Sequence, residues 1–234
     1  MLDERFWRDY FKVYDILNLV IPYQNLMTDL ERALELEADD VVLDVGSGTG
    51  NLMIKIKNKC KEVVGVDYSQ EGIEIHKLKD LSASVIVHNV VDKLPFPDNY
   101  FSKIVSNNTI YTLTESQQML VLSEIHRVMR PGGKFVISNV KKEFSPFRIY
   151  FEHFLSSVKQ SGFFKSIFLI FRMIMPTLKM FYYNNKIKKN GFIEYNFFEH
   201  DEQKDFLMKT GFQNVSEDEY VYAKQAIMNT GYKL

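Results

Sequence analysis

The sequence has few features of a secreted or membrane-spanning protein. Its single cysteine, Cys60, has no second cysteine for an internal disulfide and lacks the companions of a metal cluster, which fits a reducing compartment. No uninterrupted apolar run reaches the ~20 residues that a bilayer span needs. The charged start, residues 1–5, does not resemble a secretion signal. We therefore expect a cytoplasmic protein that holds no metal.

An excess of charge of one sign is missing as well. The 29 basic and 30 acidic residues leave a formal net charge of −1, so the chain as a whole does not attract nucleic acid. At 234 residues with 46% hydrophobic content, the chain is long enough to bury one substantial core. These values favour one α/β domain without a nucleic-acid partner.

The chain does contain an apolar run that ends in closely spaced glycines. Residues 41–45 form the run, with Asp44 as its only polar member, and Gly46, Gly48 and Gly50 follow at every second position. Glycine adopts backbone angles that other residues avoid, and it lets backbone N–H groups approach a ligand. The pattern predicts a buried strand and a tight turn that binds a small ligand at the carboxyl edge of a parallel sheet.

A second predicted strand, residues 62–67, narrows the choice of ligand. It ends in Asp67, 21 positions after Gly46. Neighbouring parallel strands place their carboxyl ends side by side, so this carboxylate is in place to accept both hydroxyls of a ribose. We therefore expect a ligand that contains ribose.

The glycine turn argues against phosphate ligands. A P-loop needs Lys followed by Ser or Thr after its last glycine, where this chain has Asn51 and Leu52. A dinucleotide turn has a glycine at the position of Asn51. The Asp44 carboxylate would repel a pyrophosphate but favours a cationic amino-acid or sulfonium group. S-adenosylmethionine (SAM) carries these cations and a ribose; the alternative is that Asp44 only caps loop N–H groups.

The rest of the chain predicts alternating helices and strands. Two helices are expected over residues 6–36, interrupted at Pro22, and their tyrosines Tyr10, Tyr14 and Tyr23 either face the core or close over the ligand. Further helices are expected at residues 52–59, 69–79, 115–129 and 201–210, and further strands at residues 84–91, 101–107 and 134–140. This order predicts a doubly wound α/β sheet.

Four ordered motifs resemble those of the class I SAM-dependent methyltransferases. They are the glycine stretch at residues 42–50, the strand and turn at 64–69, the turn at 94–98 and the helix end at 127–134. The chain is most similar to the small-molecule branch that includes ubiquinone and menaquinone methyltransferases. The resemblance implies a Rossmann-like, mostly parallel seven-stranded sheet with an antiparallel final strand and a helical lid insertion. It also implies a closing strand pair at residues 211–215 and 220–226.

The resemblance further implies SAM as cofactor, S-adenosyl-L-homocysteine as product, and a set of binding residues. The turn residues Asp44, Gly46, Ser47, Gly48 and Gly50 would border the cofactor, and Asp67 would hold its ribose. Tyr68 would lie against the adenine, Asn89, Val90 and Val91 would line its edge, and Asn107 would meet the methionine end. The family often has an acid at the position of Val90, so the adenine amino group would here meet backbone, Asn89 or water.

The motifs that the chain lacks exclude several classes of methyl acceptor. Nucleic-acid amino methyltransferases resemble one another in an Asn/Asp-Pro-Pro-aromatic element, where this chain has Ser-Asn-Asn-Thr at residues 106–109. Cys60 follows a lysine and is a poor thiolate nucleophile for cytosine, and no acid cluster suits a metal. A metal-free small-molecule reaction remains. The resemblance makes Tyr111 a candidate catalytic residue, because the family often has a residue near the reacting methyl at this place; the alternative is a packing aromatic. His153 and His200 are candidate bases, and the alternative is a structural or exposed histidine.

One long segment contains no acid. Between residues 153 and 193 there is no Asp or Glu, but there are seven basic residues: Lys159, Lys165, Arg172, Lys179, Lys186, Lys188 and Lys189. Four of these recur every seven residues, which keeps them on one helical stripe, although Pro176 must bend or break the helix. The pattern predicts a lid over an apolar pocket, contact with an anionic membrane interface through residues 159–189, or a homodimer contact.

The expected organisation is a single domain. It comprises N-terminal helices at residues 1–38, a cofactor-binding core at 40–140, a lid insertion at 143–195 and a C-terminal completion of the sheet at 196–234. The favoured function is methyl transfer from SAM to a small, apolar or lipid- or quinone-like acceptor, by a cytoplasmic enzyme that can lie peripheral to the membrane. The alternatives are a SAM-binding regulatory or scaffold protein and, less favoured, a nicotinamide-dependent oxidoreductase.

Overall fold

The computed structural model describes residues 4–189 and 195–234. The helices are α1 (Glu4–Tyr14), α2 (Ile21–Leu34), α3 (Asn51–Ile56), α4 (Gln70–Lys79), α5 (Glu115–Val128), α6 (Pro146–Ser161), α7 (Phe163–Lys189) and α8 (Glu202–Lys209), with short 3-10 helices η1 (Asp15–Leu19) and η2 (Ile110–Thr112). The strands are β1 (Val41–Val45), β2 (Glu62–Asp67), β3 (Ser84–Val87), β4 (Phe101–Asn107), β5 (Met129–Val140), β6 (Glu219–Val221) and β7 (Ala226–Tyr232).

The strands form one seven-stranded sheet in the order β3-β2-β1-β4-β5-β7-β6. The five strands from β3 to β5 are parallel, and β7 runs antiparallel to both of its neighbours. This arrangement confirms the predicted Rossmann-like sheet with an antiparallel final strand. It places the carboxyl ends of β1, β2 and β4 at one edge, where the predicted binding residues follow each strand.

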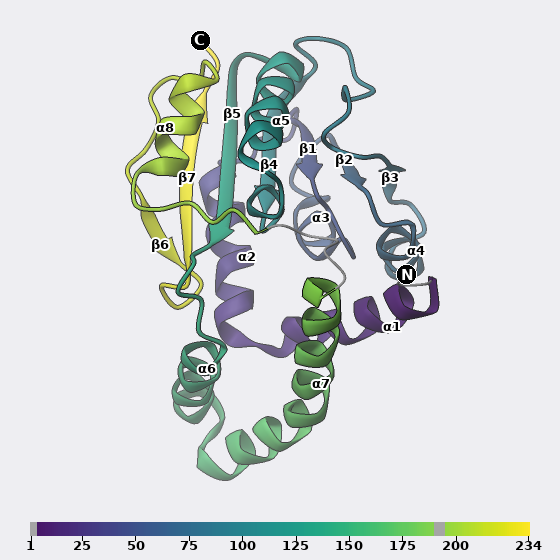
Figure 1. Ribbon diagram of the computed structural model, residues 1–234, viewed down its shortest axis with the longest axis vertical. Coiled ribbons are helices and arrows are strands. Elements are labelled where there is room, and N and C mark those ends of the chain that lie inside the picture. Colours follow the sequence, from purple (N-terminus) through teal and green to yellow (C-terminus); the bar gives the residue numbers. More distant parts are fainter. Residues whose placement is uncertain (1–3, 190–194) are drawn as a thin grey trace.

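Helices cover both faces of the sheet (Figure 1). The core on one face joins Val42 of β1 to α2 and α3, and the core on the other face joins Leu43 and Val45 to α5 and α8. Successive residues of a strand point to opposite faces, so a parallel strand covered on both sides reads as a continuous apolar run. That is why residues 41–45 were recognisable as a buried strand.

Several boundaries differ from those predicted. Strand β5 begins at Met129 rather than at the predicted residue 134. The reason is that Met129 already pairs with Phe101 of β4, before the bulge that precedes residue 134. The predicted closing pair at residues 211–215 and 220–226 is wrong: β6 and β7 are joined by a tight turn in which residues 222–224 have positive φ. Within residues 211–215, Gln213 makes an isolated bridge to Tyr232. The first helical region breaks at Val20, and α2 begins at Ile21 with Pro22 in its first turn.

Helices α6 and α7 form a hairpin beyond the carboxyl edge of the parallel strands (Figure 1). Gly162, with φ +83°, lies between them. Helix α7 continues through Pro176 and curves back to pack on α1, where Phe6 and Tyr183 meet edge to face at 5.1 Å. Among the described residues, no helix is long and apolar enough to cross a membrane.

Candidate active site

The turn after β1 can be built only from glycine at two of its positions. Gly46 has φ +82°, and a Cβ there would lie 1.9 Å from the Thr109 hydroxyl oxygen. Gly50 has φ +77°, and its Cβ would lie 2.1 Å from the His76 ring. Left-handed backbone angles already disfavour other residues, and these close approaches exclude a side chain. The turn is therefore tightly packed on its protein side.

The other side of the turn is open. Gly48 also has a positive φ, +52°, but a Cβ built on it meets no atom within 4 Å. The Asp67 carboxylate reaches the turn from the end of β2: Oδ2 accepts the Gly48 N–H at 2.8 Å, and Oδ1 accepts the Ser69 N–H at 2.8 Å. The structure thus brings together the glycine turn and the acid that the sequence placed beside it, next to space for a ligand.

Two carboxylates, buried Asp44 and half-buried Asp67, lie here without a basic partner. Asp44 is 3% exposed, and neither it nor Asp67 forms an ion pair with a lysine or arginine of the described ranges. Burial raises the pKa of Asp44 to about 7, and the nearby Asp67 adds to the rise. Burial also raises the pKa of Asp67, opposed by the backbone N–H groups of Ser69 and Gly48. Such a pair favours a cationic ligand, which fits the amino-acid and sulfonium groups of SAM.

The raised pKa of Asp44 predicts that SAM binding depends on pH. Below about pH 7 the Asp44 carboxyl is mostly protonated in the free protein, whereas a cation binds best to the ionised form. Calorimetric affinity for SAM should therefore rise as the pH increases from about 6 to about 8, by at most about tenfold per unit below the pKa. In Asp44→Asn this rise should be lost. An equal pH dependence in both proteins would contradict a role for Asp44.

The residues predicted to contact the adenine differ in how exposed their side chains are to solvent. Tyr68 is 75% exposed, as an open cofactor surface requires, and Asn89 is exposed with its Oδ1 accepting the Val91 N–H at 3.3 Å. The side chain of Val90 packs in the core, which leaves its backbone for contact with a ligand. At the end of β4, Asn107 is half-buried, and its Oδ1 has no hydrogen-bond partner among the described residues. The Ser47 hydroxyl likewise has no hydrogen-bond partner among the described residues.

The 3-10 helix η1, which precedes the sheet in the sequence, contacts the glycine turn. The Thr49 hydroxyl donates to the Asp15 carboxylate at 2.6 Å, and Lys79 of α4 pairs with Asp15 at 3.1 Å. Burial raises the pKa of Tyr14 to about 12, with further contributions from Asp15 and Asp67, so this phenol lies beside the Asp67 carboxylate. Of the three tyrosines considered from sequence, Tyr14 is thus beside the site, whereas the Tyr23 hydroxyl accepts a hydrogen bond from Asn51 at 3.3 Å.

Tyr111 belongs to a group of phenols that sequence reasoning only partly found. We call Tyr10, Tyr14, Tyr111, Tyr195 and Tyr222 the tyrosine cluster. Burial raises the pKa of Tyr10, Tyr111 and Tyr222, and members of the cluster raise one another's pKa further because they are close. Tyr10, Tyr14 and Tyr111 were candidates from the sequence, whereas no sequence pattern singled out Tyr195 and Tyr222. The cluster therefore presents neutral phenols at physiological pH.

Stacking and a polar chain hold Tyr111 in place. Its ring lies 5.5 Å from the Tyr195 ring and 5.4 Å from the Phe197 ring, both nearly parallel to it. Its backbone N–H donates to Asn139 Oδ1 at 3.2 Å. Asn139 in turn donates to Gln203 at 2.7 Å, which donates to Asn229 at 2.7 Å. Buried amide groups are almost always hydrogen-bonded, so this series of hydrogen bonds fixes the position of the 3-10 helix η2.

His153 has a structural contact. Its side chain is 2% exposed on α6, and Nδ1 accepts the backbone N–H of Ile21 at the start of α2 at 3.2 Å. Burial lowers the pKa of His153, which keeps the ring neutral with its proton on Nε2. In the described part of the chain, Nε2 has no hydrogen-bond partner. These contacts explain the burial of the ring, and a role as base stays a prediction.

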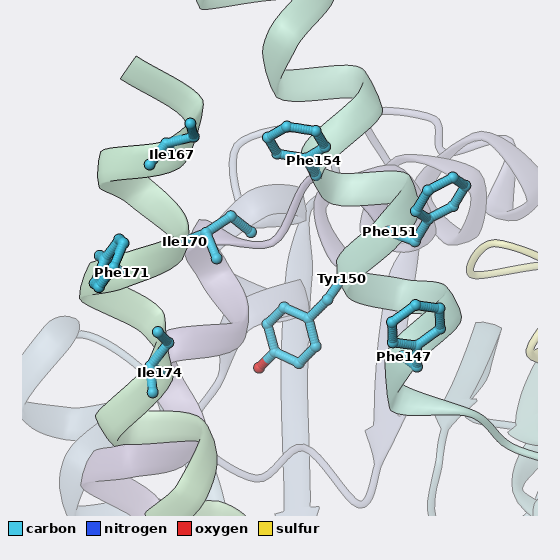
Figure 2. Close-up of a pocket in the computed structure, with 8 residues that line it drawn as sticks. All are labelled: Phe147, Tyr150, Phe151, Phe154, Ile167, Ile170, Phe171 and Ile174. Atoms are coloured by element: carbon cyan, nitrogen blue, oxygen red, sulfur yellow. The ribbon is translucent and has the colours of Figure 1, made fainter. Parts of the chain in front are cut away.

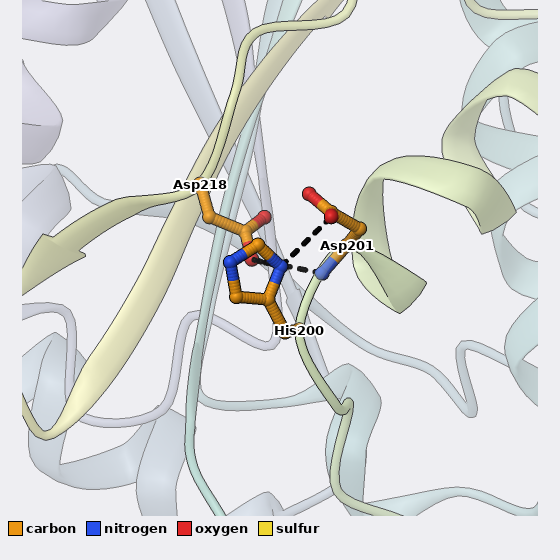
Figure 3. A group of neighbouring side chains, drawn as sticks. All are labelled: His200, Asp201 and Asp218. Atoms are coloured by element: carbon orange, nitrogen blue, oxygen red, sulfur yellow. Dashed lines mark hydrogen bonds and ion pairs between the residues drawn. The ribbon is translucent and has the colours of Figure 1, made fainter.

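A second group of titratable side chains lies at the start of α8 (Figure 3). His200 Nδ1 is 2.8 Å from an Asp201 carboxylate oxygen and 3.8 Å from one of Asp218. Asp218 also accepts the Asp201 N–H at 3.0 Å and an Asn229 amide N–H at 3.0 Å. The three side chains offer ligand atoms close enough for a metal ion. Their contacts within the chain account for their positions, and His200 is largely exposed.

The chain is similar to known methyltransferases. A methyltransferase domain family matches residues 43–137. The chain is 26% identical to the demethylmenaquinone methyltransferase of Geobacillus kaustophilus, over 99% of this chain and 97% of the relative. It is 24% identical to that of Oceanobacillus iheyensis, over 95% and 91%.

A solved structure shares the fold. The N-methyltransferase NodS from Bradyrhizobium japonicum, in complex with S-adenosyl-L-homocysteine, matches with a TM-score of 0.62 and 12% identity over 93% of this chain and 90% of that one. The family match runs from β1 into β5 and includes the glycine turn and both acids. The domain match, the relatives over most of the chain and the shared fold together support a SAM-dependent methyltransferase of the class I type, with SAM as its cofactor.

Proposed function

We propose that this enzyme methylates a small apolar acceptor of the quinone type, in the cytoplasm. The observation that carries the proposal is the tyrosine cluster, which supplies stacked rings and neutral phenols beside the two acids. A flat aromatic acceptor with ring oxygens fits such a surface, because the rings stack and the hydroxyls donate hydrogen bonds. The demethylmenaquinone methyltransferases among the relatives support this class of acceptor. The lone cysteine supports a reducing compartment.

For the cofactor we propose the residues predicted from the sequence. Asp44, Gly46 and Gly48 would border the methionine part, with Ser47 and Gly50 also lining the cofactor; Asp67 would hold the ribose, Tyr68, Asn89 and Val90 would border the adenine, and Asn107 would meet the methionine end. The two carboxylates and the open space at Gly48 support this assignment. When bound, SAM supplies a methyl group on an electrophilic sulfonium.

The chain's own residues would catalyse the reaction mainly by placement. The tyrosine cluster and η2 would hold the acceptor in line with the methyl group and keep water out, which can supply much of the rate enhancement of a displacement reaction. Because its pKa is raised, the Tyr111 phenol stays protonated and would donate a hydrogen bond to an acceptor oxygen. It is therefore a positioning donor in this proposal rather than a base.

Replacing Tyr111 tests this role. We expect Tyr111→Phe to lower kcat by about fivefold, the loss of one hydrogen bond of about 1 kcal/mol, and to leave SAM affinity unchanged. Tyr111→Ala should lower kcat further because the stack with Tyr195 is lost. Tyr100→Phe, at an exposed tyrosine next to Phe101, is the control. Loss of stability with unchanged kcat in Tyr111→Phe would identify Tyr111 as a packing residue only.

The acceptor class can be tested directly. A quinol ring is electron-rich and a quinone ring is not, so the electrophilic methyl group should go to the reduced form. We expect transfer of labelled methyl from SAM to demethylmenaquinone that has been reduced with dithionite, and much slower transfer to a polar catechol such as dihydroxybenzoate. Faster transfer to the catechol would contradict an apolar acceptor.

A further inference from the structure

The α6–α7 hairpin exposes large apolar side chains on one face. We call this the α6–α7 face; its exposed members are Phe147, Phe151, Leu155, Phe163, Phe164, Phe168, Phe171, Met175, Leu178 and Tyr182. Phe164 is 86% exposed and Phe147 76%. On α7, six of them follow one another at steps of three or four residues, from residue 164 to residue 182, and so form one stripe along the helix. Soluble proteins rarely expose such a surface without a partner.

A basic stripe runs beside this apolar one. Lys165, Arg172 and Lys179 each come one residue after a member of the apolar stripe, which places them about 100° further round the helix. All three are exposed, and none forms an ion pair with a residue of the described ranges. The one acid on either helix is Glu152 of α6. An apolar stripe flanked by unpaired cations is the pattern of helices that lie in an anionic membrane interface.

A groove opens between the two helices (Figure 2). It has a volume of about 280 Å³ and is lined by Phe147, Tyr150, Phe151 and Phe154 of α6 and by Ile167, Ile170, Phe171 and Ile174 of α7. Its only polar side-chain group is the Tyr150 hydroxyl, which is hydrogen-bonded to Thr177. Tyr150 also packs against the buried core that contains Tyr222 of the tyrosine cluster. The polar end of the groove therefore adjoins the core to which the tyrosine cluster contributes.

We propose that the α6–α7 face docks on an anionic lipid bilayer, and that the groove receives the apolar tail of the acceptor from that bilayer. Docking stands on the surface alone, whereas the identity of the tail rests on the proposed function. Anionic headgroups neutralise the basic stripe, at about 1 kcal/mol for each Lys or Arg near the surface. A second copy of the same face would instead bring like charges together, with only Glu152 of α6 as an acid to pair them.

Vesicle binding tests the docking. The full-length protein should sediment with phosphatidylglycerol-containing vesicles, weakly with pure phosphatidylcholine vesicles, and less at high salt. Lys165→Gln/Arg172→Gln/Lys179→Gln should lower partitioning by about 100-fold. A matched triple at exposed lysines elsewhere, Lys77→Gln/Lys93→Gln/Lys224→Gln, should leave it unchanged.

The apolar stripe has its own matched pair. Phe164→Ser/Phe168→Ser should lower partitioning at least tenfold, whereas Leu120→Ser/Met208→Ser, at exposed positions on α5 and α8, should not. No binding to anionic vesicles, or equal binding by the basic-stripe triple, would overturn the docking. So would a dimer in analytical ultracentrifugation that Phe164→Ser/Phe168→Ser disperses without any vesicle binding.

The groove is tested with the tail of the acceptor. Ile170→Trp would fill the groove from α7. We expect the ratio of kcat/KM for long-tailed to short-tailed reduced demethylmenaquinone to fall at least tenfold, while vesicle binding persists. An unchanged ratio would overturn the role of the groove. Vesicle binding without methyl transfer to either acceptor would contradict the proposed function instead and leave docking standing.

Discussion

Asp67→Ala should weaken SAM binding by about 100-fold. The carboxylate lies at the end of β2 and accepts hydrogen bonds from the Gly48 and Ser69 N–H groups, so it shapes the turn, and in the proposed site it also holds the ribose. Hydrogen bonds to a charged group contribute about 1.5–3 kcal/mol, and each 1.4 kcal/mol is tenfold in affinity. The measurement is calorimetry with SAM and with S-adenosyl-L-homocysteine.

Two variants separate the causes. Asp67→Asn keeps the shape and one acceptor but removes the charge, so its affinity should lie between those of the parent and Asp67→Ala. Glu74→Ala removes an exposed acid of the neighbouring α4 and should leave affinity unchanged. If Asp67→Ala binds SAM as tightly as the parent, Asp67 does not hold the cofactor.

Gly48→Val should abolish measurable SAM binding, a loss of 100-fold or more. The side chain would project into the open space beside the turn, where a Cβ meets no atom within 4 Å. The protein should still fold, because the added strain of a left-handed residue is only about 1–2 kcal/mol.

The chain offers a matched control for this strain. Gly132 also has a positive φ, +76°, and a Cβ there also meets no atom within 4 Å. Gly132→Val should therefore lose a similar amount of stability in urea unfolding but bind SAM normally. Equal loss of SAM binding in both variants would show that strain, rather than occupation of the ligand space, is responsible.

Local patterns were enough to predict the parallel strands and the glycine turn at the carboxyl edge of the sheet. The strands at residues 62–67 and 101–107 match their predicted limits, because apolar runs bounded by charged or polar residues mark buried strands. The glycines after β1 and the acid at the end of β2 predicted that Gly48 and Asp67 lie together, because adjacent parallel strands end at the same edge of the sheet. These relations depend on short stretches and one topological rule.

The contacts of the tyrosine cluster and of the last strands could not be predicted in the same way. Tyr195 and Tyr222 come from segments far from Tyr111 in sequence, and only tertiary packing brings the three near each other. The contact between His153 and Ile21 joins residues 132 positions apart. Pairing with β5 likewise placed β7 at residues 226–232 rather than at 220–226. Periodicity within a segment carries no information on such long-range contacts.

The central claim is that this chain transfers a methyl group from SAM to an apolar quinol. Mass spectrometry of a reaction with deuterated-methyl SAM and reduced demethylmenaquinone tests it most directly. The account predicts that the acceptor gains one labelled methyl group and that one S-adenosyl-L-homocysteine forms for each acceptor methylated. Tight SAM binding with neither a labelled acceptor nor S-adenosyl-L-homocysteine would contradict it.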